Sequence, residues 1–106
     1  MVYFEPDTDV LLANQLPVLG AIGRQLAADP GLRLLLRAYA APFGTAEGRR
    51  EVSDARAVFC RNFFLRNYNI AADRITYESY GAERTPENVT ADWESYRCTE
   101  LIIVVE

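Results

Sequence analysis

The sequence contains no histidine among its 106 residues. Histidine is the commonest general base, the commonest metal ligand and the usual sensor of neutral pH, so its absence argues against much of enzyme chemistry. The two cysteines cannot build a structural zinc site from the standard ligand sets without histidine. The chain also lacks a glycine-rich phosphate loop and an activated nucleophile. We therefore expect a non-catalytic protein that uses neither a cofactor nor a metal.

Long apolar runs and an excess of basic residues are missing too. Apolar runs such as Leu34–Leu36 and Leu101–Val105 fall far short of the roughly 20 residues that a membrane helix needs. Eleven basic against 15 acidic residues give a net charge of −4, which argues against a nucleic-acid binder. The N-terminus lacks the charged and apolar regions of a signal peptide. We expect either a cytosolic protein or a domain of a longer exported one.

What the sequence does contain is ordinary globular composition, with 50% apolar and 25% charged residues. Its length suits one compact domain, and no repeat, low-complexity stretch or interior linker divides it. We therefore expect residues 1–106 to form a single domain.

Apolar spacing and turn residues predict alternating strands and helices. Leu16, Leu19, Ile22 and Leu26 lie on one face of a helix that begins after Asn14 as N-cap, has Pro17 in its first turn and stops before Pro30. A second helix is predicted over 45–67 and a short helical turn over 90–96. The predicted strands are 2–4, 32–39, 75–80 and 101–105, and the second and the last of them are expected to be buried on both faces. This order predicts a two-layer α+β fold, β-α-β-α-β-(short α)-β.

Several short stretches follow one another at spacings that are informative as an ordered set. The most specific is Ser53–Ala57, where a serine and two variable residues precede Arg-Ala, and Arg74-Ile75 and Tyr80-Gly81 follow it. Further stretches of the set are Val2–Phe4, Asp29–Leu34, Asn69-Ile70, Asp73, Ser79, Ala82-Glu83, Pro86 and Asn88. In this order and spacing the sequence resembles, over nearly its whole length, the OmpA-like domain, the peptidoglycan-binding module of many Gram-negative envelope proteins.

The resemblance implies a mixed four-stranded sheet in the order 1-4-2-3, with strand 4 antiparallel and the helices on one face. In that arrangement Leu101–Val105 is central and Arg74-Ile75 begins strand 3. The resemblance also implies a location in the periplasm or cell envelope, associated with the outer membrane through the rest of the protein. The implied partner is the peptidoglycan stem peptide or an envelope protein, with no membrane insertion by the domain itself.

In the family, an aspartate in a Gly-His-Thr-Asp motif binds the ammonium of diaminopimelate, and the arginine of the serine-containing motif binds its carboxylate. This sequence keeps the arginine as Arg56, but the aspartate position is Ala41. The family's Tyr-Asn pair early in the second helix becomes Gly48-Arg49, and its Asn-Arg-Arg becomes Cys98-Thr99-Glu100. The implied, degenerate site consists of Arg56, Tyr39, Ala40, Ala41 and Arg49.

Two hypotheses follow from these departures. One is a peptidoglycan-binding domain whose binding is weak or altered, and the alternative is a structural or protein-interaction module that has lost the ligand. Arg56 could also be one of several solvated arginines on the second helix, and Tyr39 could simply cover the core. An open basic cleft at Arg56 favours binding, whereas a cleft filled by Tyr39 or closed by Pro42-Phe43 favours the alternative.

The family's oxidising compartment and the count of two cysteines suggest a disulfide between Cys60 and Cys98. Cys60 lies one helical turn beyond Arg56, and Cys98 falls where the family closes its ligand cleft. The alternative is a buried thiol at Cys60 with Cys98 separately exposed.

Overall fold

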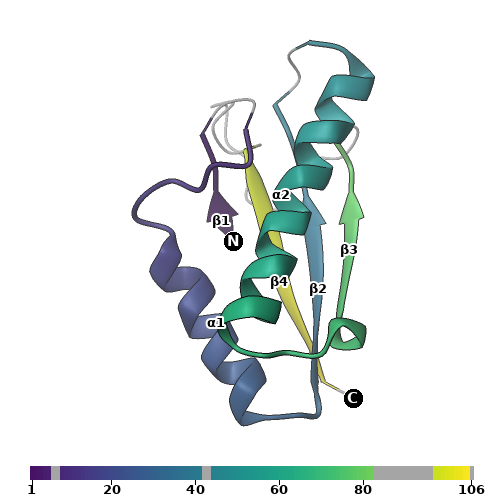
Figure 1. The fold of residues 1–106 in the computed structure, drawn as a ribbon. Coiled ribbons are helices and arrows are strands. Elements are labelled where there is room, and N and C mark those ends of the chain that lie inside the picture. Colours follow the sequence, from purple (N-terminus) through teal and green to yellow (C-terminus); the bar gives the residue numbers. More distant parts are fainter. Residues whose placement is uncertain (6–7, 42–43, 83–96, 106) are drawn as a thin grey trace.

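The structure is a computed structural model that describes residues 1–5, 8–41, 44–82 and 97–105. A four-stranded sheet forms one layer, and two long helices lie together on one of its faces (Figure 1). The elements are β1 (Val2–Tyr3), α1 (Leu16–Ala28), β2 (Leu32–Ala38), α2 (Ala46–Asn67), the 3-10 turn η1 (Ala72–Arg74), β3 (Ile75–Ser79) and β4 (Cys98–Val105). The predicted α+β fold is confirmed, while the helical turn predicted over 90–96 lies outside the described residues.

The strands lie in the order β1-β4-β2-β3. β4 is antiparallel to both of its neighbours, and β2 and β3 are parallel. The predicted order and the central position of the last strand are therefore confirmed. β3 begins at Ile75, directly after Arg74, as predicted.

The helix starts follow from local chemistry. Thr45 caps α2, and its hydroxyl accepts a hydrogen bond of 3.0 Å from the backbone N–H of Gly48. The N-cap of α1 is Gln15 rather than the predicted Asn14, and neither side chain caps the helix. Pro17 lies in the first turn of α1, where a missing N–H costs no helical hydrogen bond, so this helix accommodates the proline.

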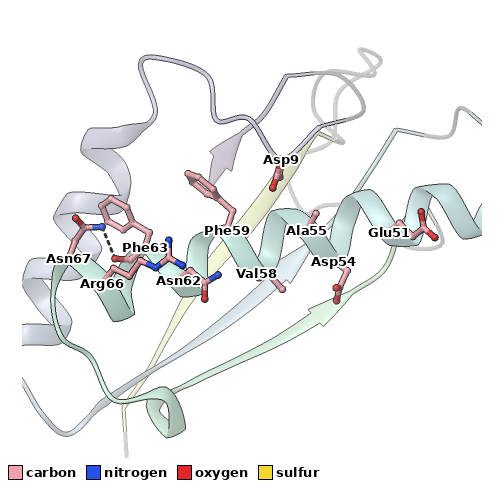
Figure 2. Close-up of a pocket in the computed structure, with 10 residues that line it drawn as sticks. All are labelled: Asp9, Glu51, Asp54, Ala55, Val58, Phe59, Asn62, Phe63, Arg66 and Asn67. Carbon is pink, nitrogen blue, oxygen red and sulfur yellow. Dashed lines mark hydrogen bonds between the residues drawn. The ribbon is translucent and has the colours of Figure 1, made fainter.

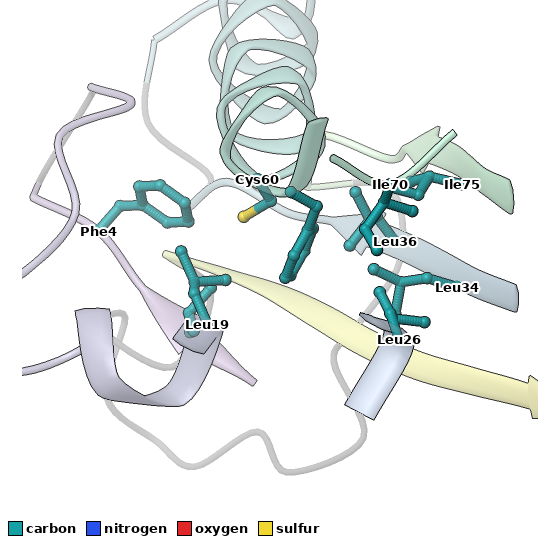
Figure 3. Packing of buried hydrophobic residues seen from close by; sticks show 10 residues of the cluster. Phe4, Leu19, Leu26, Leu34, Leu36, Cys60, Ile70 and Ile75 are labelled. Atoms are coloured by element: carbon teal, nitrogen blue, oxygen red, sulfur yellow. The ribbon is translucent and has the colours of Figure 1, made fainter. Parts of the chain in front are cut away.

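The hydrophobic core lies between the sheet and the two helices (Figure 3). Leu34 and Leu36 of β2 point into it from the sheet, and Leu19 and Leu26 meet them from α1. The fully or almost fully buried members are Val2, Phe4, Leu19, Leu26, Leu34, Leu36, Cys60, Phe64, Ile70 and Ile75. These side chains hold α2 in place above β2, which positions the site described below.

Two predicted strands are not buried on both faces, contrary to expectation. Along β2, Leu34, Leu36 and Ala38 are buried, whereas the alternate residues are half-buried or exposed. In β4, Val104 and Val105 are exposed. The reason is that both helices lie on one face of the sheet and β1 pairs only with Cys98 and Thr99, so the far end of β4 is paired with β2 on one edge and has no described strand on the other.

Candidate functional site

A surface hollow lies between the end of β2 and the first turns of α2. Its volume is about 330 Å³, and it is lined by Ala40, Ala41, Gly44, Thr45, Gly48, Arg49, Glu51 and Val52. Three of the predicted site residues, Ala40, Ala41 and Arg49, are thus brought together. The other two, Tyr39 and Arg56, do not line it. We call this the β2–α2 hollow.

The wall of the β2–α2 hollow is fixed by hydrogen bonds. Ala40 donates its N–H to the carbonyl of Gly81 over 2.7 Å, which ties the end of β2 to the end of β3. Gly44 has a φ of +76°, a conformation that glycine adopts without strain. The Arg49 guanidinium donates to the Gly44 carbonyl over 3.0 Å. These hydrogen bonds join the segments around the hollow, whose described lining includes the charged residues Arg49 and Glu51.

Arg56 lies beneath this surface, only 1% exposed. Its guanidinium donates to the backbone carbonyls of Thr8 over 2.8 Å, Tyr39 over 2.9 Å and Glu5 over 3.0 Å. Its charge also lies over the Phe4 ring, 5.4 Å from the centroid. Arg56 therefore joins the segment after β1 to the end of β2, and it is not a solvated arginine.

Tyr39 is buried on the sheet face that points away from the helices. It follows Ala38, whose side chain is on the helix face, and successive residues of a strand alternate between faces. Its hydroxyl donates to the Glu100 carboxylate over 2.5 Å, and its ring packs on Tyr80 with centroids 5.5 Å apart. Burial, reinforced by that hydrogen bond, raises the pKa of the Tyr39 phenol. Tyr39 therefore neither fills nor lines the β2–α2 hollow.

The predicted disulfide between Cys60 and Cys98 is wrong, because both residues are buried thiols. Thr99 pairs with Ala38 and so shares its helix-facing side of the sheet, where Cys60 of α2 lies. Cys98, one residue earlier, points to the opposite face. The sheet itself separates the two sulfur atoms, and burial raises the pKa of each thiol to about 12.

A second hollow was not predicted from the sequence. It has a volume of about 520 Å³ and runs along the outward side of α2 (Figure 2). It is lined by Asp9, Glu51, Asp54, Ala55, Val58, Phe59, Asn62, Phe63, Arg66 and Asn67, and we call it the α2 groove. The available signal was the apolar character of Ala55, Val58, Phe59 and Phe63 on a helix that is otherwise strongly charged.

Within residues 1–5, 8–41, 44–82 and 97–105, no three His, Cys, Asp or Glu side chains are grouped so that they could hold a metal ion. No helix in this part of the chain is both long and apolar enough to cross a membrane. The arrangement offers shaped surface hollows with fixed charges at their rims, which is suited to binding.

The family model of the OmpA family matches residues 3–97 of the sequence. The chain belongs to the OmpA family. No curated relative matches the sequence of this OmpA-family domain.

Solved structures share its fold. The peptidoglycan-associated lipoprotein from Burkholderia pseudomallei has a TM-score of 0.85 at 21% identity, over 97% of this chain and 88% of that one. The C-terminal domain of Helicobacter pylori MotB has a TM-score of 0.80 at 14% identity, over 99% and 84%. The OmpA-like domain of FopA1 from Francisella tularensis subsp. tularensis SCHU S4 has a TM-score of 0.78 at 14% identity, over 98% and 70%.

Proposed function

We propose that this OmpA-family domain is a non-catalytic module of the bacterial cell envelope, of the peptidoglycan-binding type, with a degenerate pocket for the stem peptide. Its membership in the family supports the general class. The name of a structural neighbour, the peptidoglycan-associated lipoprotein, supports the ligand class, and the same neighbours support a location in the periplasm or cell envelope. The pocket is the β2–α2 hollow.

The missing aspartate weakens the ammonium end of this pocket. Ala41 lines the β2–α2 hollow at the position where the family has its aspartate, so a diaminopimelate ammonium meets a methyl group there. The loss of one charge-assisted hydrogen bond costs roughly 1.5–3 kcal/mol, or about a ten- to hundredfold decrease in affinity. Among the described lining residues, Glu51 is the carboxylate.

The enclosure of Arg56 supports the degenerate character of the pocket. A carboxylate can receive the two-pronged grip of a guanidinium only if its nitrogens are accessible, and those of Arg56 donate to three backbone carbonyls instead. To bind a stem carboxylate, Arg56 would have to release the segment after β1. We therefore expect diaminopimelate stems to bind weakly or not at all.

The same enclosure favours a second candidate function. If Arg56 serves only to hold the fold together, the domain is a structural or protein-interaction module that keeps the OmpA architecture without the ligand. The two candidates differ in whether the β2–α2 hollow binds any stem peptide.

An NMR titration distinguishes them. Muropeptides that differ only in the third stem residue, diaminopimelate or lysine, are added to the unaltered domain and to Ala41→Asp. We expect weak, fast-exchange shifts around the hollow, and an affinity about ten- to hundredfold higher for Ala41→Asp with the diaminopimelate stem. Ala21→Asp, which places the same charge on an exposed position of α1, is the matched control.

The outcomes separate the hypotheses cleanly. Tight binding by the unaltered domain that Ala41→Asp leaves unchanged would show that the stem site lies elsewhere. No shifts with either the unaltered domain or Ala41→Asp would leave the structural module as the function.

A further inference from the structure

The α2 groove has an apolar floor that no described element covers. Val58, Phe59 and Phe63 are half-buried in it, and Phe59 is held edge-on against Phe4 with ring centroids 6.0 Å apart. Two neighbouring hollows share residues with the groove and meet at Leu16. They add exposed apolar surface, since Leu16 is 51% and Val10 is 56% exposed. Contiguous apolar surface of this kind marks interaction sites more often than scattered residues do.

The charges of the groove are separated along the helix. Glu51 and Asp54 lie at the end near the start of α2, Arg66 lies at the other end, and Asp9 lies beside the helix between Ala55 and Phe59 (Figure 2). The 15 helical steps from Glu51 to Arg66 span about 22 Å. Within the described part of the chain, the structure shows no ion pair for Arg66. One helix face thus carries a negative end, an apolar middle and a positive end.

When a second copy of this face is placed antiparallel to the first, the negative end of each face meets the positive end of the other. We propose that the α2 groove is the interface of a symmetric homodimer in which α2 packs antiparallel on α2 of a second copy. A twofold axis between Val58 and Phe59 brings Glu51 opposite Arg66 of the second copy, and Arg66 opposite its Glu51. A twofold contact uses the same patch on both subunits, which is what a self-complementary face allows.

The register also suits the side chains in between. It places Ala55 opposite Asn62 of the second copy, so a small residue faces a larger one at two symmetric positions. The half-buried Val58 and Phe59 meet at the centre, where apolar contact is best shielded from water. A parallel arrangement would instead bring the carboxylates of Glu51 and Asp54 against their own copies, which is repulsive. The antiparallel arrangement also opposes the two helix dipoles favourably.

Sedimentation velocity over a concentration series tests the proposal with a charge exchange. We expect a monomer–dimer equilibrium for the unaltered chain. The dimer should weaken at high salt, because salt screens the attraction between the Arg66 guanidinium of one copy and the Glu51 carboxylate of the other. Arg66→Glu and Glu51→Arg should each weaken dimerisation by about tenfold or more, since each replaces two attractive contacts with repulsive ones. The double variant Glu51→Arg/Arg66→Glu should restore the dimer, and an equimolar mixture of the two single variants should form a heterodimer.

Arg24→Glu is the matched control, because it makes the same charge change at an exposed position of α1 outside the groove. It should leave dimerisation unchanged, and circular dichroism should show that every variant is folded. Three results would each overturn the proposal. These are a monomer at every concentration, a dimer indifferent to Arg66→Glu, and a loss in both single variants that neither the double variant nor the mixture repairs. The stem titration is independent of these results, because the β2–α2 hollow shares only Glu51 with the groove.

Discussion

Replacing Arg56 with alanine should destabilise the domain severely. The side chain is 1% exposed and makes three hydrogen bonds to carbonyls, of which the bond to Tyr39 is buried and those to Glu5 and Thr8 are partly buried. A hydrogen bond to a charged group contributes about 1.5–3 kcal/mol when buried, and less where water can replace it. The truncation also leaves a void beside Phe4.

The sum of these effects is a loss of about 3–5 kcal/mol, a large part of the roughly 5–15 kcal/mol by which domains of this size are stable. Urea denaturation followed by far-ultraviolet circular dichroism measures it. Arg56→Lys keeps the charge but not the three-way donor geometry, so we expect an intermediate loss. Arg24→Ala, at an exposed position of α1, should change stability by less than about 0.5 kcal/mol.

The reasoning is refuted if Arg56→Ala and Arg24→Ala unfold at the same urea concentration. That result would mean that water satisfies the three carbonyls at no cost, and that Arg56 is available to a ligand after all.

Two further predictions concern buried positions. Cys60 and Cys98 should resist alkylation in the folded domain at pH 8 and react fully in urea, because burial raises both pKa values to about 12. Rapid alkylation of the folded domain would contradict this prediction. Unfolded thiols ionise near pH 8.5, so the stability that the buried, protonated thiols contribute is fully present below that pH and is lost as the pH rises toward 12. Gly23→Ala should cost about 1–3 kcal/mol by thermal denaturation, because its Cβ would lie 2.5 Å from the Tyr68 ring. Gly20→Ala should be neutral or stabilising, because its Cβ would lie 3.4 Å from the Tyr68 hydroxyl oxygen, an ordinary contact distance. Equal losses of stability at both positions would rule out this steric explanation.

The sequence was sufficient for the architecture, because hydrophobic spacing and the OmpA-like motifs constrain the same strands and helices. It was insufficient to determine which face of the sheet each residue of β4 occupies. Cys98 and Thr99 are both buried, so composition alone does not tell which of them faces α2, and a shift of one residue exchanges the two faces. The disulfide prediction failed at this step.

The candidate site also depends on contacts between residues that are far apart in sequence. The motif located Arg56 on the second helix correctly. Its enclosure depends on the carbonyls of Glu5 and Thr8, which are 51 and 48 residues away in sequence. Backbone carbonyls carry no signature in a sequence, so no pattern could reveal that the guanidinium was already engaged. The charge pattern of the α2 groove was readable in principle, but it gains meaning only once α2 is known to expose that side.

The position of β4 has a consequence for how the chain folds. β4 is the last of the four strands in sequence, yet it lies between β1 and β2 and joins them. A chain growing from its N-terminus can form the parallel pair β2 and β3, but β1 has no neighbour in the sheet until Cys98 and Thr99 arrive. Its partners are almost the full chain length apart, and such distant contacts slow folding. The domain therefore completes its sheet only after synthesis has passed β4, and until then β1 has no partner strand.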